Sequence, residues 1–447
     1  MTPEPVMVQR GSRIAVIGSG ISGMAAAYFL SRRYEVHLFE KEPRIGGHTH
    51  THLIEEPESD FLTAVDTGFI VHNDRTYPNL VRLFDELGVK RQPSDMSFGV
   101  SSRETGFEYS SRGLKGFFAQ RTNLLRLRHY LFFAELLRFN REAAKLPTEP
   151  DVALTLGDYL ERNRFSKDFI DLYLYPMASA VWSTSLEKIR DFPALTLIKF
   201  FANHGFLGID TQFEWKTVKG GSSMYIAPLT APYRERIHTS VSITRVVRGA
   251  RGVQLHFNDQ PPRQFDHVVL ATHAPQALAL LDQPTADEQR ILGNFQTSHS
   301  RVWLHTDASI MPTRTDAWAS WNYHLLRSSG PNGNPQVTVT YHMNRLQSLN
   351  TARQYFVTLN ALDAIDPRSI LREVEYSHPL YTVNAVQAQK EWDKISGGNR
   401  THFCGAYWFY GFHEDGLKSA LHVANALGVA WDHKPASEPE RALAAAR

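Results

Sequence analysis

The first clear pattern in the chain is a short apolar run, then glycines, then apolar residues at helical spacing. Residues 13–17 form the apolar run, and residues 21–30 carry apolar side chains at intervals of three and four. Residues 34–40, which include Val36, Leu38 and Phe39, are interpreted as a second strand. The pattern predicts a strand, a tight turn, a helix and a second strand, which is a βαβ unit with parallel strands.

The rest of the chain divides into blocks of different periodicity. Residues 114–232 have mainly helical spacing, and a mixed segment covers residues 275–379. A helix is expected at residues 416–427. Strands are expected at residues 237–247, 252–258, 265–271, 337–343, 355–359 and 401–404.

The length of 447 residues favours two domains, because one hydrophobic core rarely serves so long a chain. We expect an α/β fold in which a discontinuous, Rossmann-like nucleotide-binding domain comprises residues 1–95, 215–285 and 385–432. An inserted α+β substrate domain, or cap, is expected from residues 96–214 and 286–384. Residues 433–447 lack a pattern and are interpreted as a flexible tail.

Charge and cysteine content narrow the class of protein. A formal net charge of +2 gives no reason to expect a nucleic-acid partner. The single cysteine, Cys404, excludes an internal disulfide and fits a reducing compartment. The first residues lack the apolar core of a signal peptide, and no stretch is apolar enough to cross a bilayer. We therefore expect a cytoplasmic protein, and its oligomeric state stays open.

Six residues between the first strand and the first helix form a phosphate-binding motif, Gly18-Ser19-Gly20-Ile21-Ser22-Gly23. Gly18 suits the tight turn, Gly20 lets the backbone approach a pyrophosphate, and Gly23 lets the helix pack on the strand. The helix N-terminus adds free N–H groups and the positive end of the helix dipole. Glu40, which ends the second strand, can accept hydrogen bonds from ribose hydroxyls. Together these residues predict a dinucleotide site.

A second glycine pair follows Glu40 in the segment Lys41 to His48. Gly46 and Gly47 allow close passage along a bulky ligand, and Arg44 can neutralise phosphate. In this segment the chain resembles the flavin-containing amine oxidase superfamily, which includes phytoene-desaturase-like and protoporphyrinogen-oxidase-like enzymes. The resemblance implies FAD held in a fold of the glutathione-reductase and amine-oxidase type. His48 replaces the arginine of most members, so the role of that side chain does not carry over.

The resemblance extends over almost the whole chain. It includes residues 65–69 beside the isoalloxazine, a glycine pair at 220–221, an apolar strand at 266–271 and residues 403–405 and 411–416, where a helix N-terminus faces the flavin pyrimidine. Cys404 does not match the covalent attachment of flavin in the family, so FAD is expected to be non-covalent. The resemblance and the glycine motif imply these cofactor-binding residues: Gly18, Ser19, Gly20, Ile21, Ser22, Gly23, Glu40, Lys41, Arg44, Gly46, Gly47, His48, Thr67, Gly68, Phe69, Val241, Gly405, Phe412, Glu414 and Asp415.

Two stretches, Gly-His-Thr-His from Gly47 and Gly-Phe-His-Glu-Asp-Gly from Gly411, also resemble a narrower bacterial group of NAD/FAD-binding oxidoreductases. Members of that group accompany cyclopropane-fatty-acid-synthase-like methyltransferases, and some act on fatty acyl chains. Phe412 stands where amine oxidases carry a substrate-guiding tyrosine, and Ala406 where many relatives carry a carboxylate. The resemblance therefore implies an apolar or lipid substrate.

Three residues are candidates for catalytic proton transfer: His413, Glu414 and His48. For His413 and Glu414, an alternative role in capping the following helix or packing under the cofactor stays open. His48, His50 and His52 alternate and would share one face of a strand. Because flavin chemistry needs no metal, we expect His48 to lie near the flavin and we expect no metal site.

The expected function is transfer of hydride from a C–H bond of an unsaturated or branched fatty acyl chain to flavin N5. Dioxygen or another acceptor then reoxidises the flavin. A flavin-dependent double-bond isomerase, an amine oxidase and a non-catalytic flavoprotein partner are the alternatives. Helical aromatic residues of the cap are expected to be mostly core, and these are Tyr173, Tyr175, Trp182, Phe192, Phe200 and Phe201.

Basic and aromatic residues are interleaved between positions 115 and 145. Such a segment can lie on an anionic bilayer, which would make the protein peripheral to the membrane. The alternative is an amphipathic helix that packs in the cap with a solvated basic face. The basic residues are Lys115, Arg121, Arg126, Arg128, Arg138, Arg141 and Lys145.

Overall fold

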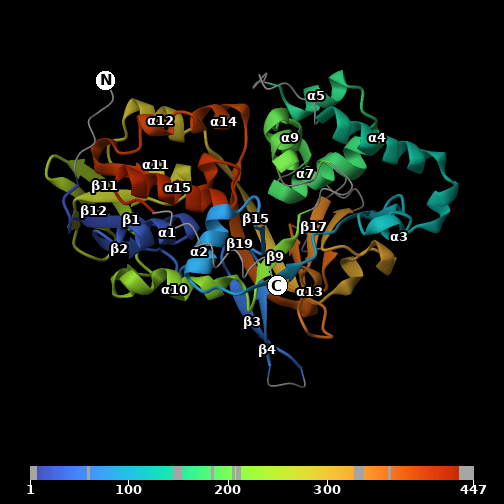
Figure 1. Ribbon diagram of the computed structural model, residues 1–447, viewed down its shortest axis with the longest axis horizontal. Helices are drawn as coiled ribbons and strands as arrows, with labels where there is room; N and C mark the ends of the chain where they lie inside the picture. The colour runs from blue at the N-terminus through green and yellow to red at the C-terminus, as the bar shows by residue number, and fades with distance from the viewer. Residues whose placement is uncertain are drawn as a thin grey trace, which may run out of the picture.

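The computed structural model describes residues 8–57, 61–143, 154–182, 186–203, 207, 213–326, 337–360 and 364–431. Figure 1 shows a parallel sheet with its helices at one end of the molecule and a group of helices at the other. The predicted tail and Lys145 lie outside the described residues, and the domain boundaries stay a prediction.

A five-stranded parallel sheet has the order β10-β2-β1-β14-β20. The predicted βαβ unit is confirmed, because helix α1 (Ile21–Leu30) connects the two adjacent parallel strands β1 and β2. The sheet thus combines segments far apart in the sequence. Its strands are β1 (Arg13–Ile17), β2 (Glu35–Phe39), β10 (Ile237–His238), β14 (His267–Leu270) and β20 (Thr401–Phe403).

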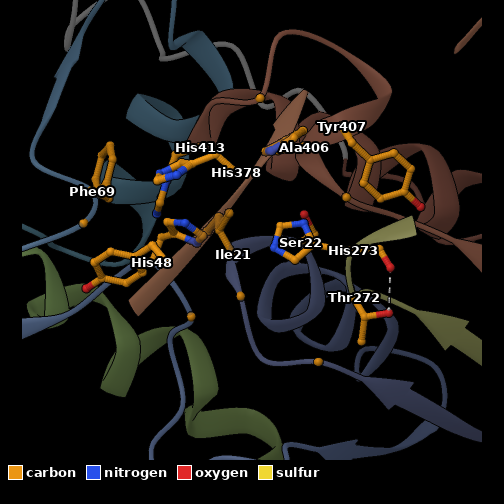
Figure 2. Close-up of a pocket in the computed structure, with 18 of the residues that line it drawn as sticks. Ile21, Ser22, His48, Phe69, Thr272, His273, His378, Ala406, Tyr407 and His413 are labelled. Atoms are coloured by element: carbon orange, nitrogen blue, oxygen red, sulfur yellow. Dashed lines mark hydrogen bonds between the residues drawn. The ribbon is translucent and has the colours of Figure 1, made fainter. Parts of the chain in front are cut away.

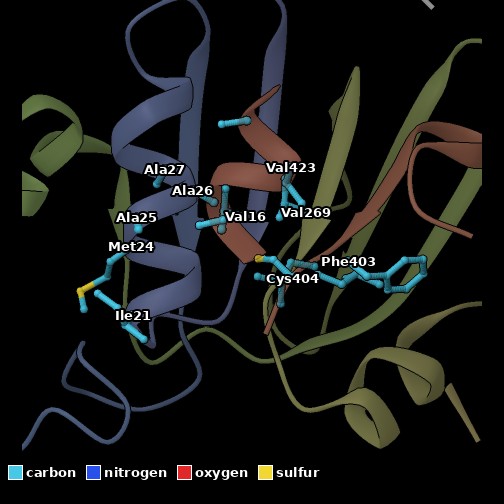
Figure 3. Close-up of a cluster of buried hydrophobic side chains, with 14 of the residues drawn as sticks. Val16, Ile21, Met24, Ala25, Ala26, Ala27, Val269, Phe403, Cys404 and Val423 are labelled. Atoms are coloured by element: carbon cyan, nitrogen blue, oxygen red, sulfur yellow. The ribbon is translucent and has the colours of Figure 1, made fainter. Parts of the chain in front are cut away.

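Helix α15 (His413–Ala426) packs beside α1 and against this sheet (Figure 3). The core around these helices and the sheet is fully buried and includes Val16, Met24, Val269 and Val423. Cys404 is also buried there, and burial raises the pKa of its thiol far above the usual range. Cys404 therefore behaves as a small apolar core residue.

Two glycines let α1 approach its neighbours closely. A Cβ atom on Gly23 would overlap with the carbonyl oxygen of Gly18 in the preceding turn. A Cβ atom on Gly416, in the first turn of α15, would lie 2.7 Å from Ile21 Cγ2 and 2.8 Å from Ser22 Oγ. The first turns of α1 and α15 can therefore meet because Gly416 lacks a side chain, and α1 can lie against the Gly18 turn because Gly23 lacks one.

A seven-stranded sheet forms the second large layer, in the order β19-β15-β18-β17-β16-β7-β8. Its neighbouring strands are antiparallel except for β16 and β7. The strands are β7 (Phe98–Ser102), β8 (Glu108–Ser110), β15 (Gln296–His305), β16 (Trp321–Leu325), β17 (Val337–His342), β18 (Phe356–Leu359) and β19 (Ile370–Leu380).

Three small antiparallel sheets complete the strand structure. Their orders are β11-β12-β13, β3-β4 and β5-β9-β6. Strand β9 lies inside the segment predicted to be mainly helical, and it pairs with two strands from the first hundred residues. The bounds are β3 (Thr51–Glu55), β4 (Leu62–Asp66), β5 (Val71–Asn73), β6 (Arg91–Ser94), β9 (Trp215–Val218), β11 (Ile243–Gly249), β12 (Gly252–Phe257) and β13 (Arg263–Phe265).

The remaining helices cover the sheets or form the helical end of the molecule, where Figure 1 shows α4, α5, α7 and α9 together. They are α2 (Pro78–Glu86), α3 (Gly113–Phe117), α4 (Leu127–Ala143), α5 (Leu156–Arg162), α6 (Lys167–Phe169), α7 (Tyr175–Trp182), α8 (Leu186–Arg190), α9 (Ala194–Asn203), α10 (Ile226–Thr230), α11 (Ala274–Leu280), α12 (Ala286–Leu292), α13 (Met343–Leu346) and α14 (Val383–Gln389).

Three details of the sequence prediction are wrong. The single strand expected at residues 237–247 is two strands in different sheets, because Ser240 has a left-handed φ of 56° that turns the chain. His48 and His50 precede strand β3, so the three alternating histidines do not share one strand. Helix α15 begins at His413, three residues before the predicted start, because the Asp415 carboxylate accepts a hydrogen bond from Phe412 N–H.

We expect Gly23→Ala to lower the free energy of unfolding by about 1–3 kcal/mol, because the added methyl group forces α1 away from the Gly18 carbonyl. Urea denaturation of the cofactor-free protein measures this change. Gly20→Ala is the control, since a Cβ atom there meets no protein atom within 4 Å. Equal stability of the two variants would contradict the packing argument.

Candidate functional site

A cavity of about 730 Å³ lies at the carboxyl ends of the parallel strands (Figure 2). Residues of the β1–α1 turn, the end of β2 and the segment after β14 line one part of it. Strands of the seven-stranded sheet, together with α7 and α9, line the other part. In parallel α/β sheets, ligands bind at this edge, because strand ends and helix N-termini meet there.

The glycine turn contributes its backbone to the cavity wall. Gly18, Ser19, Gly20, Ile21 and Ser22 all line the cavity, and a Cβ atom on Gly20 would point into open space. Helix α1 has no side-chain cap at its N-terminus. Its first N–H groups and its dipole are therefore available to a phosphate.

Glu40 lines the cavity beside the glycine turn. Its Oε2 accepts hydrogen bonds from Ser19 N–H, at 3.0 Å, and from Ser19 Oγ, at 2.6 Å. Lys41 and Val241 line the cavity beside it, and Val241 N–H donates to the Glu40 backbone carbonyl. This end has the carboxylate and the open backbone that a ribose and an adenine require.

The remaining glycine-motif residues support the cavity from behind. Gly23 packs against the turn, and Gly46 N–H donates to the Ser19 carbonyl, at 3.0 Å. The Arg44 guanidinium donates to the backbone carbonyls of Gly47, at 2.8 Å, and Thr49, at 3.3 Å. Arg44 thus holds the second glycine pair in place, and Gly47 itself lines the cavity. Arg44 is not among the described lining residues, and its contact with phosphate stays a prediction.

The segment Thr67–Gly68–Phe69 runs along the cavity next to His48. Phe69 N–H donates to the His48 carbonyl, at 2.8 Å, and a Cβ atom on Gly68 would overlap with that carbonyl oxygen. The Phe69 ring stacks on the His413 ring with centroids 3.7 Å apart. Gly405 and Phe412 also line this part of the cavity. Flat rings and bare backbone of this kind fit a planar isoalloxazine.

His413 is the first residue of α15 and lines the cavity. Its Nε2 lies 3.0 Å from Thr49 Oγ1, which is also hydrogen-bonded to the Tyr225 hydroxyl. Burial, together with the nearby His72, lowers the pKa of His413 to about 3. His413 is therefore neutral, and its ring is held in position by a hydroxyl on one side and by Phe69 on the other.

Glu414 and Asp415 lie outside the cavity lining, contrary to the sequence expectation. The Glu414 carboxylate accepts hydrogen bonds from Leu80 N–H, at 2.9 Å, and from the side chain of Asn79, at 2.6 Å, at the start of α2. The Asp415 carboxylate accepts from Phe412 N–H. Consecutive side chains on a helix diverge by about 100°, so a helix that points His413 into the cavity points Glu414 away from it. Glu414 thus caps α2, and its carboxylate is directed to those donors and not into the cavity.

Two histidines with unpaired ring nitrogens lie side by side in the cavity wall. The His48 ring stacks on Tyr376 at 4.9 Å and lies 5.0 Å from the His378 ring. His48 Nε2 and His378 Nδ1 are buried and have no hydrogen-bond partner in the described part of the chain. Burial lowers the pKa of His48 well below its ordinary value and that of His378 to about 4. Both rings are therefore neutral, and an unprotonated ring nitrogen can accept a hydrogen bond.

Sequence reasoning missed His378, Tyr376 and His273, which all line the cavity. They come from β19 and the start of α11, more than two hundred residues after His48. No local motif surrounds them, although Tyr376 and His378 alternate as residues on one face of a strand do. In the described residues, no group of three histidine, cysteine or acidic side chains has the arrangement of a metal site.

The other part of the cavity is apolar. Six aromatic residues of the cap helices are expected from the sequence to lie mostly in the core. One of these six, Phe200, lines the cavity. Within the described part of the chain, the cavity lining contains one acidic residue, Glu40, and one lysine, Lys41, and no arginine. Both charged residues lie at the nucleotide end. The apolar wall is formed by Ile70, Met96, Val181, Phe200, Val302, Trp321, Tyr341, Leu359 and Phe412.

We expect Gly20→Val to abolish binding of FAD, because its side chain would occupy the space next to the helix N-terminus where the pyrophosphate must lie. The absorbance of flavin released on denaturation measures occupancy. Gly398→Val, which also adds a side chain in open space but outside the cavity, is the matched control. Full FAD occupancy in a folded Gly20→Val protein would contradict this assignment.

Comparison with solved structures shows the same fold at low sequence identity. The CLA-producing fatty acid isomerase from P. acnes matches with a TM-score of 0.66 and 16% identity, over 95% of this chain and 100% of that one. Cyclohexylamine oxidase from Brevibacterium oxydans IH-35A matches with 0.65 and 14%, over 93% and 98%. Wild-type putrescine oxidase bound to putrescine matches with 0.62 and 13%, over 94% and 98%.

The family itself comes from the sequence comparison. No curated protein sequence matches the chain significantly. Residues 21–428 match the model of the flavin-containing amine oxidoreductases. That match covers most of the chain and includes α1, α15 and the lining residues of the cavity from Ile21 onward. The chain therefore belongs to the flavin-containing amine oxidoreductase family, and it is an FAD-dependent oxidoreductase.

Proposed function

We propose that the enzyme removes hydride from a C–H bond of an apolar substrate, an unsaturated or branched fatty acyl chain. The observation that carries this proposal is the absence of any carboxylate, lysine or arginine from the described lining beyond Glu40 and Lys41. A substrate cation in this part of the cavity would lose its hydration without gaining a counter-ion, which costs free energy. An alkyl chain would lose only unfavourable contact with water.

The apolar wall is suited to a long chain. Burial of each methylene contributes roughly 0.8 kcal/mol, so a chain of many carbons binds without a strong polar anchor. Phe200, Trp321 and Tyr341 provide large flat surfaces on different elements of the wall. Affinity is therefore expected to rise with the length of the chain until the cavity is full.

The relatives are compatible with more than one substrate class. One solved structure of this fold is a fatty acid isomerase, whereas others are oxidases of cyclohexylamine and putrescine. Their identities of 13–16% are too low to choose among these activities. The chemistry of the cavity wall favours the acyl substrate, and the isomerase keeps double-bond isomerisation as a second candidate. Net oxidation of the substrate consumes an electron acceptor, whereas isomerisation does not. Measuring acceptor consumption therefore distinguishes the two reactions.

When bound, FAD would accept the hydride and pass its electrons to dioxygen or another acceptor. The chain supplies position and proton handling. His48 is the proposed proton acceptor for the substrate, because its Nε2 is an unpaired nitrogen in the cavity wall. His413 already contacts Thr49 and Phe69, which makes it a positioning residue at the start of α15.

We expect His48→Gln to slow flavin reduction about 10²- to 10⁴-fold while FAD content is unchanged, because glutamine keeps the polarity of the site but cannot accept a proton. Anaerobic stopped-flow mixing with unsaturated or methyl-branched acyl lipids measures the bleaching of the flavin. His256→Gln, on β12 and outside the cavity, is the control. Rapid reduction by simple primary amines, with none by any acyl lipid, would overturn the proposal.

A charged wall should weaken substrate binding. Met96 lines the apolar part and is only partly buried, so Met96→Glu adds a carboxylate there with little disturbance of the core. We expect at least about tenfold weaker binding of the acyl lipid, since the carboxylate must lose hydration when the chain binds. Titration of the flavin absorbance measures the affinity. Met96→Leu should bind as the unmodified protein does, and equal losses in both variants would count against an apolar site.

A further inference from the structure

The segment from α3 through α4 exposes an unusual number of apolar side chains. Most of the large hydrophobic residues that are exposed in the described chain lie here, and Leu125 has an exposed fraction of 92%. Folded proteins rarely leave such residues grouped in water without a binding role. The group consists of Leu114 in α3, Leu124 and Leu125 in the short helix η1 (Arg121–Leu125), and Leu127, Tyr130, Leu131 and Leu137 in α4.

The exposed residues of α4 form a stripe along one face. Leu127 and Leu131 are four residues apart, and Tyr130 and Leu137 are seven apart, so these exposed residues share the outer half of the helix. Phe132 and Phe139, also seven apart, are buried on the opposite side. A helix that merely packs on a cap has a polar outer face. Helix α4 has apolar residues on both faces, so packing within the protein accounts for only one of them.

The same segment is strongly basic. Residues 111–134 contain no aspartate or glutamate. Lys115 pairs with Asp316, and Arg128 pairs with Asp168. Arg121 and Arg126 are exposed and form no ion pair within the part of the chain that the structure describes. Two unneutralised cations therefore flank the exposed leucines.

We propose that this surface, formed by the exposed leucines and arginines of α3, η1 and α4, binds the interface of an anionic phospholipid bilayer. Leucine side chains would enter the boundary between headgroups and acyl chains, and Arg121 and Arg126 would meet lipid phosphates. No described helix is both long and apolar enough to cross a bilayer, so contact from one side fits the elements present. The inference rests on the exposed surface and is independent of the proposed substrate.

The position of the surface fits this orientation. Figure 1 shows α3 and α4 at the helical end of the molecule, away from β11 and β12 at the other end. Helices α7 and α9, which belong to the same helical end, contribute Val181 and Phe200 to the apolar wall of the cavity. A bilayer bound at α3 and α4 would therefore lie on the side of the molecule whose helices line the apolar part of the cavity.

The test is sedimentation of the FAD-loaded protein with vesicles of phosphatidylcholine, with and without phosphatidylglycerol, at low and high salt. We expect Arg121→Gln/Arg126→Gln to weaken binding to the anionic vesicles about twentyfold, because each basic residue near such a surface contributes roughly fivefold. Leu125→Ser/Leu127→Ser should weaken it at both salt concentrations, since salt screens only the charge contribution. Arg234→Gln/Arg251→Gln, two exposed arginines on other elements, should bind as the unmodified protein does.

FAD content and melting temperature of each variant report whether the fold is intact. Equal binding to neutral and anionic vesicles, or binding unaffected by both double substitutions, would overturn the proposal. Absence of vesicle binding, with a change of oligomeric mass on Leu125→Ser/Leu127→Ser, would also overturn it and would identify the surface as a contact between protein chains. Vesicle sedimentation and oligomeric mass are both measured without turnover of substrate. A negative result would therefore count against membrane binding alone and not against the proposed acyl substrate.

Discussion

The contact between the first turns of α1 and α15 is the constraint on which the site depends. Gly416 brings α15 onto Ile21 and Ser22, and Gly23 brings α1 onto the glycine turn. Both helices thereby direct their N-termini to one cavity, and each adds the positive end of its dipole. A dinucleotide carries negative charge in its pyrophosphate, and a reduced flavin carries it in the pyrimidine ring. Close helix packing is therefore also the electrostatic basis of cofactor binding.

The start of α15 decides the role of each side chain next to it. His413 faces the cavity and stacks on Phe69, whereas Glu414 is directed to the first N–H groups of α2. A carboxylate buried without partners would be costly, and these N–H groups satisfy it. One helical register therefore separates a residue that lines the cavity from one that caps α2. It also connects α2 to the helix that borders the cavity.

Burial gives the cavity two kinds of surface. At the nucleotide end, Glu40 and open backbone groups provide hydrogen bonds, while the far wall is aliphatic and aromatic. Between them, desolvation keeps His48 and His378 neutral. Neutral imidazoles can accept hydrogen bonds without placing a charge beside an apolar chain. The outer face of α4 differs from the cavity, because its basic residues lie at the surface and keep their charge in water beside the exposed leucines.

The sequence by itself determined the βαβ unit, the glycine turn and the position of Glu40, because all of these lie within thirty residues and follow local rules. The family motifs also led to FAD. Only the tertiary structure decided the partners of His48, because Tyr376 and His378 lie on a strand more than three hundred residues away. Local patterns also missed the left-handed turn at Ser240 and the true start of α15, which depend on backbone geometry and capping. The tertiary structure also decided that the α4 leucines are exposed. Periodicity in the sequence indicates which residues share a helix face, but it does not indicate whether another part of the protein covers that face.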